Sequence, residues 1–266
     1  DGLPIVPPTA ERVGRFLERA GRDPSEIIGT EPTRGRVVTA EKLSINAVMA
    51  GCLPEHLPVV MAALEAMCEP AFNLHAVTVS TMGAAVLTVV NGPVVKELGL
   101  NSGVGVFGPG NRANATIGRA VRLAVTNVTG AVPGELDKAT LGHAGKYTWC
   151  IAEAEDASPW EPLHVERGFS ADRSVVTVFG GLSPIQSSDP AQALVAAGTG
   201  HREIVVVLPP EAVGEIVPHA SSKAQLKELL FQGSRAAGAP VTESADGITV
   251  VVAGGPAGNF SQVIPL

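Results

Sequence analysis

Short apolar runs that alternate with helix-like segments are the feature that most constrains the fold of this chain. The runs are rich in the β-branched residues that favour buried strands. They occupy residues 84–90, 174–179, 203–208 and 248–256. In the second half, one helical segment begins at residue 189, and two more lie near residues 210–217 and 222–237. Such alternation favours a largely parallel sheet covered on both faces, so the expected fold class is α/β.

The N-terminal part is predicted to be an extended arm followed by helices. Three prolines in DGLPIVPPT remove backbone donors and favour the arm. Thr9 can cap a helix that Gly21 ends, and two more helices are expected over 39–50 and 54–68. The apolar stretch AVTVS at 76–80 predicts a strand.

Regular periodicity fades over residues 131–169, and loops of this length usually bind or catalyse. We expect a single domain over 1–266 with two α/β lobes around largely parallel sheets and a cleft between them. The first lobe spans about 1–170 and includes this loop, and the second spans about 171–266. LTVVNGP and ITVVVAGGP both describe a buried strand that ends at a Gly-Pro turn. Two related halves facing one cleft, or chance similarity, would explain this match.

Composition and charge exclude several classes of protein. The net charge is −7 and aromatic residues make up 4% of the chain, so it has neither a basic stripe nor stacking platforms for nucleic acid. It shows no apolar run of membrane-spanning length and no secretion leader, so no membrane partner is expected. Cys52, Cys68 and Cys150 are too scattered for a disulfide scaffold, and reduced thiols in the cytoplasm are expected.

The stretch VFGPGNRANATIGRAV predicts a helix that begins near Asn111 directly after a Gly-Pro-Gly turn. Gly108 and Gly110 would let the backbone approach a ligand, and the free N–H groups of the helix start favour an anion. Arg112 and Asn114 add side-chain donors. The alternative is that Asn111 is only an N-cap and Arg112 only a solvated side chain.

A second candidate is AGCLPEHLP, in which Cys52 precedes the helix expected over 54–68. A helix N-terminus lowers the pKa of a thiol and would make Cys52 a nucleophile. His56 would be its base, and Glu55 would orient that histidine or accept a proton. The alternative is that Cys52 is a small packed side chain, as we expect for Cys68.

Acidic, basic and hydrogen-bonding side chains crowd the segment HAGKYTWCIAEAEDASPWEPLHVERGF. Such a mixture suits a catalytic loop, and we assign catalytic roles to His143, Lys146 and Glu166 and substrate binding to His164. Two histidines and a carboxylate could also bind a divalent metal, although the spacing matches no metal motif. Lys146 could instead only pair with Glu153.

The ends of two strands supply further candidates for substrate binding. Ligands of α/β sheets gather beyond the carboxyl ends of the strands. Asn91 follows the first long apolar run, and Gly254 and Gly255 follow the last one. We therefore expect these residues to face the same cleft.

Several long motifs carry a resemblance to a known family. They are DGLPIVPPTAERV, INAVMAGCLPEHLPVV, VNGPVVKELGLNSGVGVFGPGNRANATIGRA, HAGKYTWCIAE, SPWEPLHVERGF and VVVAGGP. Together they resemble the UGSC-type (seleno)protein family over most of 1–170 and the final strand. The resemblance implies a soluble, enzyme-like α/β protein whose redox-active relatives carry selenocysteine or cysteine. This chain is a divergent case: it has no UGSC or CGSC tetrapeptide and carries GGLSPIQSSDP in place of a His- and Asn-rich stretch.

The leading hypothesis is an enzyme that acts on a small anionic metabolite by hydrolytic or lyase chemistry. The helix start after Gly110 would bind the anion, the segment from His143 to Glu166 would supply acid and base, and Cys52 would be nucleophile or polar wall. One alternative is a non-catalytic accessory subunit of a hetero-oligomeric enzyme. Another is a metal-dependent enzyme that uses His143 and His164. The sequence requires no cofactor, and the N-terminal arm is compatible with a homo- or hetero-oligomer.

Overall fold

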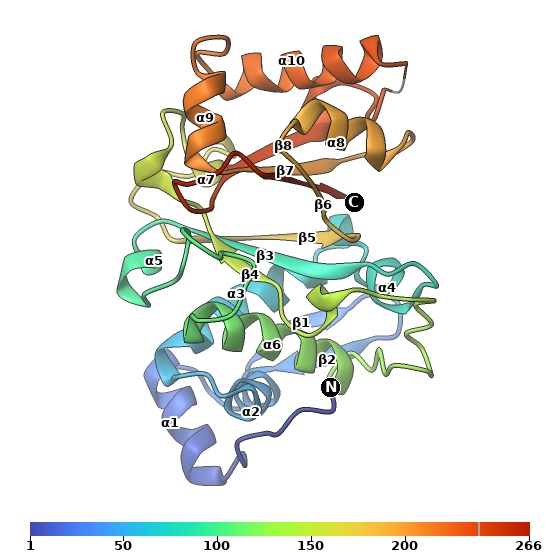
Figure 1. Ribbon diagram of the computed structural model, residues 1–266. Helices are drawn as coiled ribbons and strands as arrows, with labels where there is room; N and C mark the ends of the chain where they lie inside the picture. Colours follow the sequence, from blue (N-terminus) through green and yellow to red (C-terminus); the bar gives the residue numbers. More distant parts are fainter. Residues whose placement is uncertain (239) are drawn as a thin grey trace.

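Two sheets are stacked face to face between two layers of helices in the computed structural model of the chain (Figure 1). The structure describes residues 1–238 and 240–266. The α-helices are α1 (Ala10–Ala20), α2 (Ala40–Ala50), α3 (Leu57–Cys68), α4 (Leu74–Val79), α5 (Val94–Glu97), α6 (Arg112–Asn127), α7 (Leu163–Glu166), α8 (Pro190–Ala197), α9 (Pro210–Ile216) and α10 (Lys223–Ala236). The strands are β1 (Ile27–Glu31), β2 (Arg36–Thr39), β3 (Ala85–Asn91), β4 (Cys150–Ala152), β5 (Val175–Gly181), β6 (Ile185–Ser187), β7 (Ile204–Leu208), β8 (Ile248–Val252) and β9 (Ser261–Pro265). Short 3₁₀ turns are η1 (Pro54–His56), η2 (Pro70–Phe72), η3 (Ala144–Lys146), η4 (Glu155–Ala157) and η5 (Ala245–Gly247).

The mixture of helices and sheets confirms the α/β class, but the prediction of largely parallel sheets is wrong. In the first sheet, of order β4-β3-β5, β3 is parallel to β4 and antiparallel to β5. In the second, of order β6-β9-β7-β8, β7 is parallel to β8, and β9 is antiparallel to β6 and β7. β1 and β2 form a separate antiparallel hairpin. The apolar runs therefore indicate strands that are buried on both faces. In this fold such burial does not require the strands to be parallel.

Alternate residues of the central strands show how both faces become buried. In β7, Ile204, Val206 and Leu208 pack in the cluster that includes α8 and α10. Val205 and Val207 point the other way, into a cluster shared with β3, β4 and β5. The far face of the first sheet packs against α3 and α6, and α1 and α2 pack on these helices from the other side. Each sheet thus has helices on one face and the other sheet on its second face.

The helices of the N-terminal part confirm most of the local predictions. The Thr9 side chain accepts a hydrogen bond from the Arg12 N–H, and Gly21 ends α1 at φ 63°. The strand predicted at 76–80 is wrong, because these residues belong mainly to α4. Leu74 and Thr78 lie one helical turn apart and are both buried, and the Thr78 hydroxyl donates to the Leu74 carbonyl at 2.7 Å. Burial of one helix face outweighed the strand preference of the β-branched residues.

The expected lobe boundary near residue 170 needs correction. β5 follows that boundary, yet it pairs with β3 along the register from Ala85↔Gly181 to Asn91↔Val175. The first sheet therefore continues to Gly181. The strands that the sequence did not indicate are β1, β2, β4, β6 and β9, each at most five residues long.

Every residue of β7 and β8 is buried, and α3 contributes fully buried side chains such as Leu57, Val60 and Leu64. Among the described residues, no single helix has both the length and the apolarity needed to cross a membrane, although the bent pair Pro54–Cys68 and Pro70–Val79 would by length and composition.

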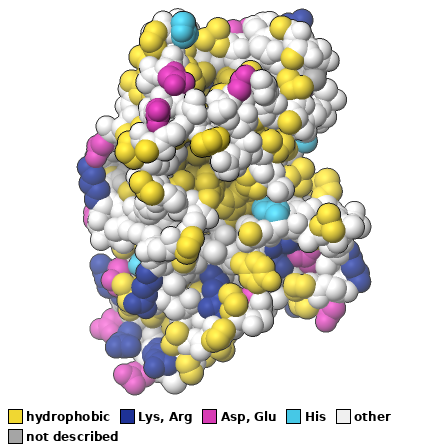
Figure 2. All heavy atoms as spheres, viewed as in Figure 1, with side chains coloured by type: hydrophobic (Ala, Val, Ile, Leu, Met, Phe, Trp, Pro, Cys, Tyr) yellow, Lys and Arg dark blue, Asp and Glu magenta, His cyan; other side chains and the backbone are white. Residues whose placement is uncertain are grey.

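On the face drawn in Figure 2, hydrophobic side chains gather in a hollow at the waist of the molecule, where the upper and lower layers meet.

Two glycines provide a stability test of the packing between α6 and the β4 segment. A Cβ on the buried Gly118 would lie 2.5 Å from Thr148 Oγ1 and 2.6 Å from the Trp149 nitrogen. Gly118→Ala is therefore expected to lower the free energy of unfolding by about 1–3 kcal/mol. The control Gly14→Ala changes a glycine of α1 with no neighbour within 4 Å, and should raise it by about 0.5–1 kcal/mol. Urea unfolding measures both, and equal effects would contradict this packing.

Candidate functional site

A large pocket, about 1090 Å³ in volume, opens beyond the carboxyl ends of β3, β7 and β8. The Asn-Gly-Pro turn after β3 contributes Gly92 to its lining, and the Gly-Gly-Pro turn after β8 contributes Gly254 and Pro256. The two turns that look alike in the sequence therefore face the same hollow. Residues 99–104, 109–111 and 153–157 complete much of the wall.

Glu153 lines this pocket, and its buried carboxylate is held by three donors. Its Oε2 accepts hydrogen bonds from Asn91 Nδ2 at 2.6 Å and from the Leu163 N–H at 2.7 Å. Its Oε1 accepts one from Lys223 Nζ at 3.1 Å. Both members of this ion pair are only 2% exposed. A buried charge needs such complete pairing, so Glu153 holds its neighbours in place with both of its oxygens hydrogen-bonded.

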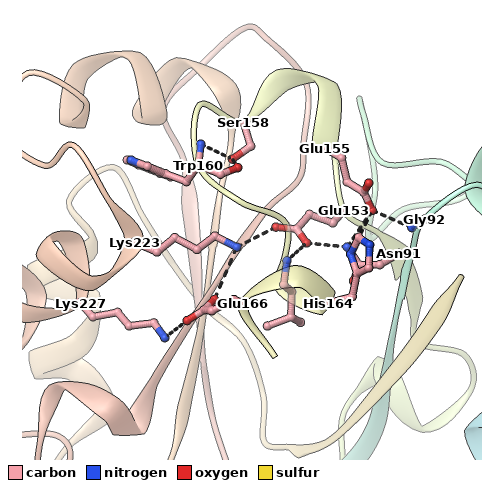
Figure 3. Close-up of polar contacts among 11 residues, drawn as sticks. Asn91, Gly92, Glu153, Glu155, Ser158, Trp160, His164, Glu166, Lys223 and Lys227 are labelled. Atoms are coloured by element: carbon pink, nitrogen blue, oxygen red, sulfur yellow. Dashed lines mark hydrogen bonds and ion pairs between the residues drawn. The ribbon is translucent and has the colours of Figure 1, made fainter. Parts of the chain in front are cut away.

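Glu155 also lines the pocket, but only one of its oxygens is held (Figure 3). Oε1 accepts hydrogen bonds from Asn91 Nδ2 at 2.9 Å and from the Gly92 N–H at 2.7 Å. Within the described part of the chain, Oε2 has no hydrogen-bond partner, and the side chain is 26% exposed. A carboxylate with one fixed and one open oxygen suits a general base.

His164 lies behind Glu155 and is fully buried. Its Nδ1 is 3.8 Å from Glu155 Oε1, and neither ring nitrogen has a hydrogen-bond partner among residues 1–238 and 240–266. The Oδ1 atom of Asn91 also lacks a partner in these ranges. Buried polar atoms without partners are rare, and each costs about 1–3 kcal/mol. Their grouping around Glu155 makes this the candidate functional site.

Five of the predicted residues belong to this site, and one of them, His164, is fully buried and does not line the pocket. Gly110, Asn111 and Gly254 line the pocket, and the Asn91 amide donates to the carboxylates of Glu153 and Glu155. Asn111 is the N-cap of α6, since its Oδ1 accepts from the Asn114 N–H at 3.0 Å and its Nδ2 donates to the Gly99 carbonyl at 2.7 Å. The predicted helix start and strand end therefore do share one hollow.

Other predicted binding residues support the wall of the pocket from behind. The side-chain amide of Asn114 bonds both backbone groups of Asn101, at 2.8 and 2.9 Å. The Gly108 N–H donates to the Gly105 carbonyl at 2.6 Å. A Cβ on Gly255 would lie 2.7 Å from Val104 Cγ2. Asn114, Gly108 and Gly255 therefore shape the loop over 101–110, but they do not themselves line the pocket.

Arg112 is turned away from the pocket, so its predicted contact with an anion is wrong. Its Nε and Nη2 atoms donate to the Gly51 carbonyl at 3.2 and 2.9 Å. Gly51 is the C-cap of α2. The guanidinium therefore satisfies a carbonyl at a helix end, as cations at C-termini often do.

Two predicted catalytic residues, His143 and Lys146, lie outside the pocket lining. His143 Nδ1 accepts from the Gly145 N–H at 3.2 Å, and Nε2 is 3.3 Å from the Gly181 carbonyl oxygen. Burial is the main cause that lowers the pKa of His143. Lys146 pairs with Asp137, at 2.8 and 2.9 Å, and not with Glu153. Both side chains are occupied with structural contacts.

Glu166 is held by α10 and does not line the pocket. It forms an ion pair with Lys227, and its Oε2 lies 3.7 Å from Lys223 Nζ. Figure 3 shows this pair on the far side of Glu153 from Glu155. Because both lysines neutralise it, Glu166 fastens α7 to α10, and its predicted catalytic role is not supported.

The metal alternative is not supported by the positions of the two histidines. His143 contacts Gly181, whereas His164 lies beside Glu155. Across the described ranges, no three His, Cys, Asp or Glu side chains are grouped to hold a metal ion.

The expected activation of Cys52 is reversed in the structure. Cys52 is 6% exposed, and its thiol donates to the Thr116 carbonyl at 3.3 Å. Burial raises the pKa of Cys52 to about 12. His56 Nδ1 accepts a hydrogen bond from the Leu53 N–H at 3.2 Å, and burial lowers the pKa of this histidine. Cys52 is a packed thiol, and all three cysteines are free.

Comparison with known proteins gave no match to a family model, a curated protein or a solved structure. The resemblance to the UGSC-type family stays a prediction. The divergent segment GGLSPIQSSDP forms the end of β5 and all of β6, which pairs with β9. It has a structural role in this chain.

Sequence reasoning missed Glu155, Lys223 and Lys96. Lys223 did carry a signal, because it opens α10 directly after the N-cap Ser222. A cation is unfavourable at a helix N-terminus, so a carboxylate partner could have been expected. Glu155 and Lys96 carried none, since each lies in a short element of no more than four residues.

The buried ion pair predicts unequal effects of two lysine substitutions. Lys223→Met should lower the free energy of unfolding by about 3–5 kcal/mol, because it leaves the Glu153 charge buried without its cation. Lys227→Met removes a more exposed cation and should cost about 1 kcal/mol or less. Urea unfolding of both variants and of Lys223→Met with Glu153→Leu measures this. Similar losses in the two single variants, or no recovery in the double variant, would contradict the assignment.

Buried His56 and half-buried His143 predict a pH dependence of stability. Burial lowers the pKa of His56 and His143 below the ordinary value of 6.5. The unfolded chain then binds these protons more readily, so their contribution is complete above about pH 6.5 and is lost as the pH falls below it. Unfolding at pH 7.5 and 5.5 should show a smaller pH effect in His143→Asn than in the parent. An equal or larger effect in the variant would refute this prediction.

Proposed function

We propose that the chain is an enzyme that acts on a small polar metabolite by acid/base chemistry, hydrolytic or lyase. The two stacked sheets with their helices are the two lobes of this proposal, and the pocket is the cleft between them. The observation that carries it is the Glu155 carboxylate, anchored at Oε1 by Asn91 and Gly92 and open at Oε2 to a pocket of about 1090 Å³.

In this mechanism Glu155 Oε2 removes a proton from the substrate or from a water molecule. Removal from a carbon beside a carbonyl would begin a lyase reaction, and removal from water would begin hydrolysis. Asn91 fixes the carboxylate, because its amide donates to both Glu153 and Glu155. His164 positions Glu155: a small movement that shortens the 3.8 Å separation would let a ring N–H donate to Oε1.

This proposal replaces the catalytic roles expected for Cys52, His143, Lys146 and Glu166. Each is buried or paired with another group, whereas Glu155 has a free oxygen in the pocket. The reaction class stays that of the leading hypothesis, with a different base.

An accessory subunit is the second candidate, and two exposed apolar side chains favour it. Met82 is 59% exposed and Leu141 is 95% exposed. Their loops lie side by side, since the Thr140 N–H donates to the Thr81 carbonyl at 2.9 Å. Neighbouring exposed apolar residues suit a partner protein. Co-purification of another subunit that Met82→Lys with Leu141→Lys abolishes would support this candidate.

Activity of the purified chain against a panel of small carboxylic and phosphorylated metabolites tests the enzyme proposal. Glu155→Gln should lower kcat by about 10²–10⁴-fold, because the amide cannot accept the proton. Cys52→Ser and His143→Asn, both outside the pocket lining, should stay within a few-fold of the parent. Unchanged turnover in Glu155→Gln, or loss only in Cys52→Ser, would refute the assignment of the base.

A further inference from the structure

Lys96 is the only cation among the described residues that line the pocket. It lies on α5, directly after the turn that carries Gly92. The other charged side chains of the lining are Glu153, Glu155 and Asp156. Glu153 is already neutralised by Lys223. Glu155 and Asp156 therefore repel an anionic ligand, and Lys96 attracts it.

The present partner of Lys96 is easily exchanged. Lys96 Nζ lies 2.8 Å from Asp156 Oδ2, and the two side chains are 80% and 82% exposed. Exposed ion pairs contribute little to stability, so an anionic ligand can replace Asp156 at small cost. The hydrogen bond and charge of Asp156 raise the pKa of Lys96, and the charge of Glu155 adds to this effect. Lys96 thus stays protonated and is within electrostatic reach of the proposed base.

The start of α6 is hydrogen-bonded to Gly99, which follows α5 and is itself bonded to Lys96. The Gly99 N–H donates to the Lys96 carbonyl at 3.2 Å, and Asn111 Nδ2 donates to the Gly99 carbonyl at 2.7 Å. Gly110 and Asn111 line the pocket together with Gly99. The positive end of the α6 dipole therefore reinforces the field of Lys96.

We propose that Lys96 determines specificity: it leaves Asp156 and binds a carboxylate or phosphate group of the substrate, so that the pocket selects small anions. This inference rests on the proposed function of the pocket and names its substrate class. It gives the anion a different cation from the one that the sequence indicated, because Arg112 bonds Gly51.

Binding measurements test this without a known substrate. Malonate and inorganic phosphate serve as anionic probes and malonamide as the neutral control, each titrated by calorimetry into the full chain at low salt. The parent should bind at least one anion and bind malonamide at least tenfold more weakly. Lys96→Gln should weaken anion binding about tenfold or more, because a charge-assisted hydrogen bond is lost. Asp156→Asn should strengthen it, since it frees Lys96.

The matched control is Arg22→Gln, which breaks an exposed ion pair with Glu26 away from this pocket. It should bind the anions as the parent does. Anion binding that is unchanged in Lys96→Gln, equally weakened in Arg22→Gln, equalled by malonamide or absent from the parent would overturn the inference. Glu155→Gln should still bind the anions. Anion binding by the parent, with no turnover of any metabolite by the parent, would refute the enzyme proposal and leave the anion site standing.

Discussion

The carboxylate of Glu153 is the point on which the site depends. Its three donors come from the end of β3, the start of α7 and the start of α10, so one buried charge joins both layers of the molecule. A buried carboxylate is tolerated only where its partners are complete, and this requirement fixes Asn91 and Lys223. The same Asn91 amide then reaches Glu155. The position of the open Glu155 carboxylate is therefore a consequence of the hydrogen bonds that hold the buried Glu153 carboxylate.

The stacked sheets explain why this network faces a hollow. β3 ends in the first sheet and β7 and β8 end in the second, and all three carboxyl ends open on the same pocket. Turns of glycine and proline leave small side chains there, so backbone and a few polar groups form the wall. Stacking puts Glu155, the α6 start and Lys96 around one space although they are far apart in the chain.

Local patterns predicted the parts of the fold that local interactions determine. The cap at Thr9, the stop at Gly21 and the start of α6 at Asn111 each depend on neighbours within one turn. Strand direction and the side chains that meet in the pocket depend on distant pairing, which periodicity does not contain. For the same reason, the helix start after Cys52 predicted a reactive thiol. The burial of this thiol depends on α6, which packs against it and is distant in the sequence.

The most direct test of the account is a crystal structure of the protein with a bound substrate or anionic analogue. We expect the ligand in the pocket beyond β3, with a protic atom or water within hydrogen-bonding distance of Glu155 Oε2. A ligand bound against Cys52 or His143, with the Glu155 side of the pocket empty, would contradict it.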